Sequence, residues 1–431
     1  MPSLVPTPWL SLLLQLTALR TFSIVVAMAE LVRDDAPLAV RGGQENQSID
    51  ADSAARSTNV CRDRLLQPFA SSSIWNTPIG SGAELQPAGI FDGRFPLPVD
   101  FHIDQEWFVA TGADDPVVPW HHGYFQSCAI EGEVMASLRL PENFTTDCGM
   151  NNNAAAVLMP NGRHLVEFQP IYRPVPGGPV MGQTPQGCVG QPCELNRCHP
   201  AADCDILGNG TTGAHGGSGL SSLGGSIRKG ELFGDPSHGA PPIRHALKLE
   251  FFGHLYYWWK VNVTTNRTCY RWPAIGCDGY APTAYRGTQP YVSPGSLLVV
   301  PEAAASRIES NLTTTPARRI LHALRDYGGY LVDDPDGPAA CFCAEKAVID
   351  ELKREYGWDL SISNSAGNWT LGVRPTNSGH AFYWDLIQVF RELHVVINNG
   401  PDSVGGGGSS RRAPWAPPIC PRDGDIDAWY V

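Results

Sequence analysis

Short runs of apolar residues, separated by glycine, proline and asparagine, fill the chain from about residue 68 to residue 298. Several runs alternate apolar with polar positions. In 164–169, for example, Leu165 and Glu167 share one face of a strand and Val166 lies on the other. The runs predict strands at 107–110, 134–140, 154–159, 164–169, 246–252, 256–263 and 296–300.

Helix signals appear only in the last third of the chain. Apolar positions at helical spacing predict helices at 317–327, 343–356 and 382–393, the first of them ending at Gly328-Gly329. Strands followed by a few helices are typical of a mainly β protein. We expect a β-sandwich or jelly-roll-like core with a few C-terminal helices.

The first 60 residues lack this pattern. Residues 9–29 are mostly apolar and end in Ala27-Met28-Ala29, which predicts a signal peptide over 1–29. Residues 30–58 are polar and predict a disordered leader. A single β-rich domain is expected over 61–420, with helical additions from about 303. The sequence predicts a flexible tail over 403–431.

The mature chain is expected to be extracellular. Arg20 interrupts the N-terminal apolar run, and no later run reaches the roughly 18 apolar residues that span a bilayer. Twelve cysteines, an even number, favour a disulfide framework over metal binding, and the spacing of the four between 188 and 204 fits no zinc finger. Seven Asn-x-Ser/Thr sequons indicate a glycoprotein.

The composition of the chain excludes some classes of function. The formal net charge of −12 excludes a protein that binds nucleic acid by neutralising phosphates. Abundant glycine and proline, with only 17% charged residues, indicate many turns and short strands. Candidate chemistry concentrates around one glycine-rich segment, because 213–232 combines a freed backbone with His215, Arg228 and Glu231, and 243–249 adds His245.

Six segments resemble a broad family of secreted, mostly uncharacterised bacterial and eukaryotic proteins. They are IWNTPI at 74–79, RHLVEFQP at 163–170, HGGSGLSSLGG at 215–225, IRHALK at 243–248, YRWPA at 270–274, and the segment 327–334. The resemblance covers most of 61–420. It implies secretion and an intact domain but no particular reaction, and it draws attention to the segments that carry Glu167, Arg228, Glu231 and His245.

We expect a carbohydrate-active protein that acts on a polysaccharide or glycan by acid–base hydrolysis. Such hydrolysis needs one protonated and one ionised carboxyl group. Glu167 lies among apolar residues, where burial would raise its pKa and suit it to act as the acid. Glu231 follows Arg228 by three residues and would stay ionised as nucleophile or base. Arg228 and His245 would position the substrate.

Two other function classes remain open. In a polysaccharide lyase, Arg228 or Asn152 would neutralise the uronic carboxylate, His215 or His245 would take the proton, and Tyr124 or Tyr256 would protonate the leaving oxygen. Alternatively, the twelve tryptophans suit a lectin or a cell-wall or matrix protein that binds sugars without cleaving them.

No metal or cofactor is expected from the sequence. Adjacent His121 and His122 point to opposite faces of a strand, so at most one of them would join a site with His215 or His245. His-x-His and His-Glu-x-x-His patterns do not occur, and no glycine-rich nucleotide motif lies between a strand and a helix.

Overall fold

A computed structural model describes residues 61–93, 100–123, 128–129, 132–148, 152–183, 203–233, 242–259, 269–335, 337–361 and 379–421. These residues belong to one compact unit, Thr58–Val431. The expected signal peptide and leader, most of the 188–204 cysteine cluster and Tyr124 lie outside the described residues.

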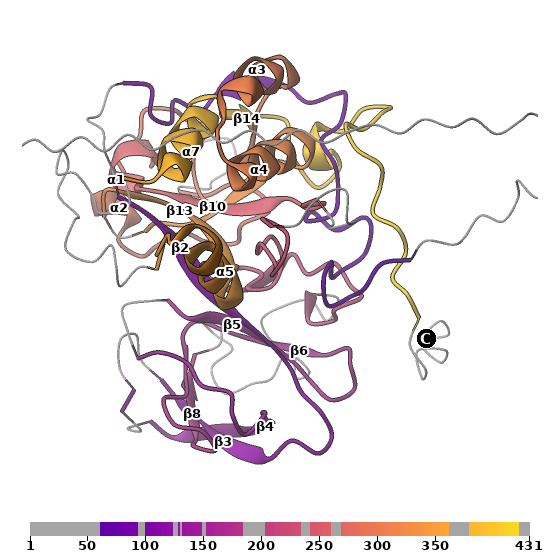
Figure 1. Ribbon diagram of the computed structural model, residues 1–431, viewed down its shortest axis with the longest axis vertical. Coiled ribbons are helices and arrows are strands. Elements are labelled where there is room, and N and C mark those ends of the chain that lie inside the picture. Colours follow the sequence, from indigo (N-terminus) through magenta and orange to yellow (C-terminus); the bar gives the residue numbers. More distant parts are fainter. Residues whose placement is uncertain are drawn as a thin grey trace, which may run out of the picture. The chain divides into compact units, whose positions relative to one another are not determined.

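A nine-stranded mixed sheet forms the centre of this unit (Figure 1). Its strands, in spatial order, are β1 (Leu85–Pro87), β14 (His394–Val396), β11 (Leu297–Val299), β12 (Gly329–Asp333), β10 (Leu247–Phe251), β13 (Ala339–Glu345), β2 (Asp100–Ala110), β5 (Ala154–Leu158) and β6 (Leu165–Phe168). The pairs β10/β12, β13/β2 and β2/β5 are parallel, and the other pairs are antiparallel.

Helices cover one face of this sheet. They are α3 (Glu302–Ile308), α4 (Thr315–Asp326), α5 (Lys346–Tyr356) and α7 (Ala381–Arg391), accompanied by the short helices α1 (Gly253–Tyr256), α2 (Ala281–Ala284) and η5 (Glu309–Asn311). The short helix η7 (Val404–Gly406) packs elsewhere, with Val404 against a second apolar cluster. Phe101, Ile103 and Phe342 of the central strands pack in one apolar cluster with Leu324 of α4 and Phe390 of α7. Burial of these side chains drives the sheet and helices together.

The opposite face of the central strands carries polar side chains that are nevertheless buried. Side chains alternate along a strand, so Asp104 and Glu106 of β2 point away from Ile103 and the helices. In the same way, Lys248 of β10 and Cys343 of β13 lie opposite their apolar neighbours. The short strand β9 (Thr212–His215) and the glycine-rich loop after it cover this polar face.

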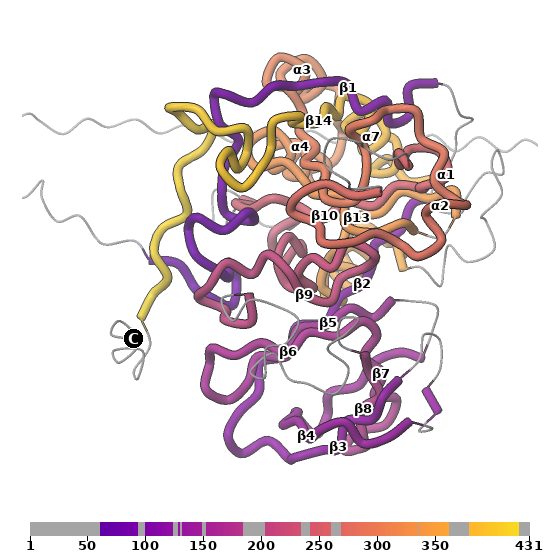
Figure 2. The backbone as a smooth tube through the Cα atoms, turned by 180° about the vertical axis from the view of Figure 1, so that it is seen from behind, coloured from indigo at the N-terminus to yellow at the C-terminus, as the bar shows by residue number. Residues whose placement is uncertain are grey.

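A second sheet contains β4 (Val134–Arg139), β3 (Val117–His122), β8 (Val180–Gly182) and β7 (Ile171–Tyr172), in that order. Trp120 and Leu138 of this sheet share an apolar cluster with Val109, Val157 and Phe168 of β2, β5 and β6. Figure 2 shows the second sheet at the β5–β6 end of the first, where β9 also lies beside β6.

The mainly β architecture with few helices confirms the coarser sequence prediction. A jelly roll is not confirmed, because the large sheet contains parallel as well as antiparallel pairs. The strand predicted at 256–263 is wrong at its start, since Tyr256 ends helix α1. The helix predicted from residue 343 begins at Lys346, because Cys343 lies in β13.

Covalent links confirm the disulfide prediction. Cys61–Cys420, Cys128–Cys148 and Cys269–Cys277 are bonded, and Cys204 is also in a disulfide. The Cys61–Cys420 link fixes part of the segment predicted as a flexible tail, and residues 403–421 hydrogen-bond to Gly80, Ser81 and Gly82. Among the described helices, none is long and apolar enough to cross a bilayer.

Candidate functional site

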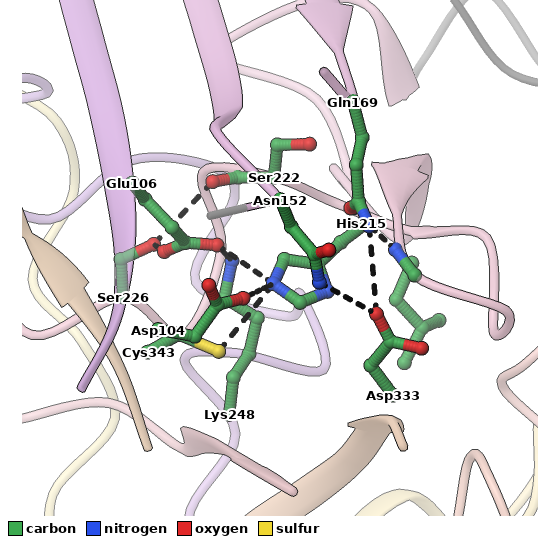
Figure 3. A network of polar contacts seen from close by, with 12 residues as sticks. Asp104, Glu106, Asn152, Gln169, His215, Ser222, Ser226, Lys248, Asp333 and Cys343 are labelled. Atoms are coloured by element: carbon green, nitrogen blue, oxygen red, sulfur yellow. Dashed lines mark hydrogen bonds and ion pairs between the residues drawn. The ribbon is translucent and has the colours of Figure 1, made fainter. Parts of the chain in front are cut away.

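His215, at the end of β9, is the centre of the buried polar network (Figure 3). Its Nε2 lies 3.0 Å from Glu106 Oε1, 3.5 Å from Asp104 Oδ2 and 3.4 Å from Cys343 Sγ. Burial and the charge of Lys248 disfavour the protonated ring. The neighbouring carboxyl groups of Asp104 and Glu106 outweigh them and raise the pKa of His215 to about 9.

Glu106 is held by two further donors. Lys248 Nζ forms an ion pair with Glu106 Oε1, and Ser226 Oγ donates to Glu106 Oε2. Lys248 Nζ also donates to the backbone oxygen of Ser221, at 3.1 Å. The network therefore fastens the glycine-rich loop to strands β2 and β10.

Asp333 lies at the end of β12, on the side of the polar network that is nearer to solvent. Its Oδ1 accepts from the backbone N–H of Gly217 at 3.1 Å, and its Oδ2 accepts from the half-buried side-chain amides of Asn152 and Gln169 at 3.2 and 3.4 Å. Burial and the negative charge of Asp278 raise the pKa of Asp333 to about 8.

Gly216 and Gly217 allow two carboxyl groups to flank one turn. A Cβ on Gly216 would lie 2.6 Å from Asp333 Oδ2, and a Cβ on Gly217 would lie 2.7 Å from Asp278 Oδ1. Gly216 also has a φ of +56°, a conformation that side-chain-bearing residues rarely adopt. Asp278 is half-buried and accepts a hydrogen bond from the hydroxyl of Tyr285.

An open cavity of about 420 Å³ includes Ile275 in its lining, and Ile275 packs against Gly219, two residues after this turn. Tyr270 and Trp272 line it on one side, and Asp203 and Thr211 are among its polar residues. The aromatic residues belong to a loop closed by the Cys269–Cys277 disulfide, so the residue after that loop is Asp278. Thr212 of β9 also lines the cavity, and β9 continues to His215.

Glu167 supports the glycine-rich loop from beneath. Its carboxylate accepts from Ala214 N–H, Ser221 Oγ and Ser222 N–H at 2.7–3.0 Å. Burial raises the pKa of Glu167, and these hydrogen bonds oppose the shift. Gly213 permits the approach, since a Cβ there would overlap Glu167 Oε2.

Arg228, Glu231 and His245 come together in a separate, closed cluster. Glu231 Oε2 accepts from Arg228 N–H at 2.7 Å and lies 3.1 Å from His245 Nε2, while the Arg228 guanidinium lies 2.7 Å from Glu345 Oε1. The cavity beside Arg228 and His245 measures only about 10 Å³. This is close to the least that one water needs and far too small for a sugar.

The remaining candidate positions are divided between the two faces. Asn152 lies at the Asp333 site. Tyr256 packs on the helix-covered face against Phe91 and Phe251. Asp104, Glu106, Lys248, Glu250, Asp278, Asp333 and Cys343 were not identified from the sequence. The alternation of Asp100, His102, Asp104 and Glu106 was a usable signal, because it marks one face of a strand.

Comparison of the chain with protein-family models, with curated proteins and with solved structures found no match.

Proposed function

We propose that this protein is a secreted carbohydrate-active enzyme that hydrolyses glycosidic bonds, with Asp333 as general acid and Asp278 as nucleophile or base. The observation that carries the proposal is the pair of carboxyl groups on either side of the Gly216-Gly217 turn, together with a cavity whose lining includes Tyr270, Trp272 and Ile275, just before Asp278 in the chain. Hydrolysis of this kind needs two such groups in contrasting surroundings.

Asp333 suits the acid role better than Glu167 does. Two of the donors to Glu167 are backbone N–H groups of a buried loop, which a substrate has no means of replacing. The donors to Asp333 Oδ2 are the side chains of Asn152 and Gln169, both half-buried and at long hydrogen-bond distances. A glycosidic oxygen can take their place at Oδ2, and the freed amides can bind sugar hydroxyl groups.

Asp278 suits the second role. It is more exposed than Asp333 and lies directly after the loop that carries Tyr270 and Trp272. A sugar ring stacked on these aromatic faces would place its bond near both carboxyl groups. Asp333 would protonate the leaving oxygen while Asp278 attacks the anomeric carbon or activates a water molecule.

The experiment is a reducing-end assay on a panel of neutral and acidic polysaccharides. We expect Asp333→Asn and Asp278→Asn each to lower turnover by about 10²–10⁴-fold with little change in Tm. Asp402→Asn, at an exposed position, is the control and should keep full turnover. Two outcomes would contradict the proposal: glycan binding without release of reducing ends indicates a lectin, and an unsaturated uronic product indicates a lyase.

A further inference from the structure

We propose that Asp104, His215, Glu250 and Cys343 form a binding site for one divalent transition metal ion, with zinc as the best fit. The site lies in the buried network behind Asp333, and the inference does not depend on the proposed hydrolase activity. Imidazole, thiolate and carboxylate are the ligands that zinc uses in proteins. One donor atom from each of the four residues lies within 4.8 Å of the other three.

The spacing of the donor atoms fits a tetrahedral ion. Bonds of 2.0–2.3 Å around zinc imply donor–donor separations of roughly 3.3–3.7 Å. His215 Nε2 lies 3.5 Å from Asp104 Oδ2, 3.4 Å from Cys343 Sγ and 4.0 Å from Glu250 Oε1. Cys343 Sγ lies 3.4 Å from Glu250 Oε1. Small shifts of the side chains would therefore complete the coordination.

The charge balance calls for a cation. Asp104, Glu106 and Glu250 bring three carboxyl groups to a region where each residue is at most 5% exposed, and Lys248 supplies one ammonium group. Unpaired charges in such a place are strongly unfavourable. A divalent ion neutralises the excess.

One atom of the cluster points independently to a missing partner. Asp104 Oδ2 is buried and makes no hydrogen bond within the described chain. Asp104 Oδ2 lies on the Nε2 side of the ring, where an ion would satisfy it. Nε2 is correctly turned for coordination, because it faces Asp104, Glu250 and Cys343 together.

Cys343 is also unusual for this chain. Every other cysteine that the structure describes is in a disulfide, except Cys341. Cys341 lies two residues earlier on the same face of β13, and its Sγ is 3.2 Å from His102 Nε2. It belongs to no described four-ligand group, so Cys341→Ser is a matched control for Cys343→Ser.

Metal content tests the proposal without any substrate. The full chain is produced with its disulfides, purified without chelators and analysed by inductively coupled plasma mass spectrometry. We expect about one zinc per chain in the native protein and in Cys341→Ser, and less than about a tenth of that in Cys343→Ser and His215→Ala. Equal zinc in all four proteins would overturn the assignment, because the ion would then bind elsewhere.

A second measurement uses only the native protein and therefore does not depend on the variants folding. Removal of metal with dipicolinate should lower Tm, and Zn²⁺ should restore it while Mg²⁺ should not. Co²⁺ in place of zinc should give a thiolate-to-cobalt absorption band. If the native chain holds no stoichiometric metal and neither Zn²⁺ nor Co²⁺ binds or changes Tm, the proposal is wrong.

Discussion

Lys248 and Glu106 form a buried ion pair that spans a strand. Lys248 belongs to β10 and Glu106 to β2, and β13 runs between them in the sheet. Both side chains are at most 2% exposed, so each charge depends on the other. The pair also fixes Glu106 within 3.0 Å of His215, which links the stability of the sheet to the geometry of the candidate site.

Removal of one partner of this ion pair should therefore destabilise the folded protein. Lys248→Met leaves Glu106 buried without its cation, and we expect a loss of about 3–5 kcal/mol in the free energy of unfolding, measured as a fall in Tm. The double variant Lys248→Met/Glu106→Gln should recover part of the loss. Lys346→Met, which removes a more exposed pair with Asp350, should cost less than about 0.5 kcal/mol. Equal effects of the two lysine changes would contradict the structure.

The Gly216 turn offers a comparison between two glycines with positive φ. Gly216→Ala places a Cβ 2.4 Å from Asp333 Cγ, whereas the same change at Gly230, with a φ of +86°, meets no atom within 4 Å. Both variants bear a backbone penalty of about 1 kcal/mol. We expect Gly216→Ala alone to displace Asp333 and abolish turnover. If the Gly216→Ala variant retained native turnover, the Gly216-Gly217 turn would not belong to the catalytic site.

The His245–Glu231 pair should make stability depend on pH. Burial opposes the charged ring, but Glu231 outweighs it and raises the pKa of His245 above the ordinary value of 6.5. The folded protein then binds the proton more tightly than the unfolded chain does. The stabilisation is complete below about pH 6.5 and is lost as the pH rises through the raised value.

Thermal unfolding of Glu231→Gln checks this expectation. The Tm difference from the native protein should be larger at about pH 6 than at high pH, because only the charged imidazole gains from the carboxylate. The chemical shift of the His245 ring should follow a lower pKa in the variant. A Tm difference that grows with pH would reverse the sign and refute the pairing.

Sugar stacking in the cavity can be tested by measuring glycan binding well below the Tm. Trp272→Ala removes an aromatic face from the cavity lining, and we expect about tenfold weaker binding of a glycan selected on an array. Because Trp272 also packs against the apolar core, we expect the variant to have a lower Tm. Trp415, which is 49% exposed and contacts Arg411, is the matched control. Unchanged affinity in Trp272→Ala would move the glycan away from this cavity.

Local patterns predicted much of the strand content but not the strand order. The alternation in 164–169 identified β6 and placed Glu167 and Val166 on opposite faces. Strand β12 is buried on both sides and has no alternation, and no strand was predicted there. Parallel pairing of β2 with β13 joins residues more than 200 positions apart, which no local pattern encodes.

Sequence patterns indicated only part of the candidate site, and the reason is physical. Glycines around His215 marked a close approach of backbone, and the structure places that approach against Asp333 and Glu167. The partners of His215 were missed because charged residues are normally exposed. Asp104 and Glu106 therefore fell outside the strand predicted at 107–110, whereas β2 begins at Asp100 and another layer of the chain covers both residues.

The Cys61–Cys420 disulfide gives the protein a covalent ring. Backbone bonds between Arg62 and Cys420 and between Arg62 and Pro418 reinforce the junction. A protease that cuts one surface loop between these two cysteines therefore leaves both pieces tethered, and the nicked protein keeps its mass until it is reduced. Such a molecule can survive single cleavages, and a chain opened in one loop and joined at this junction should still fold.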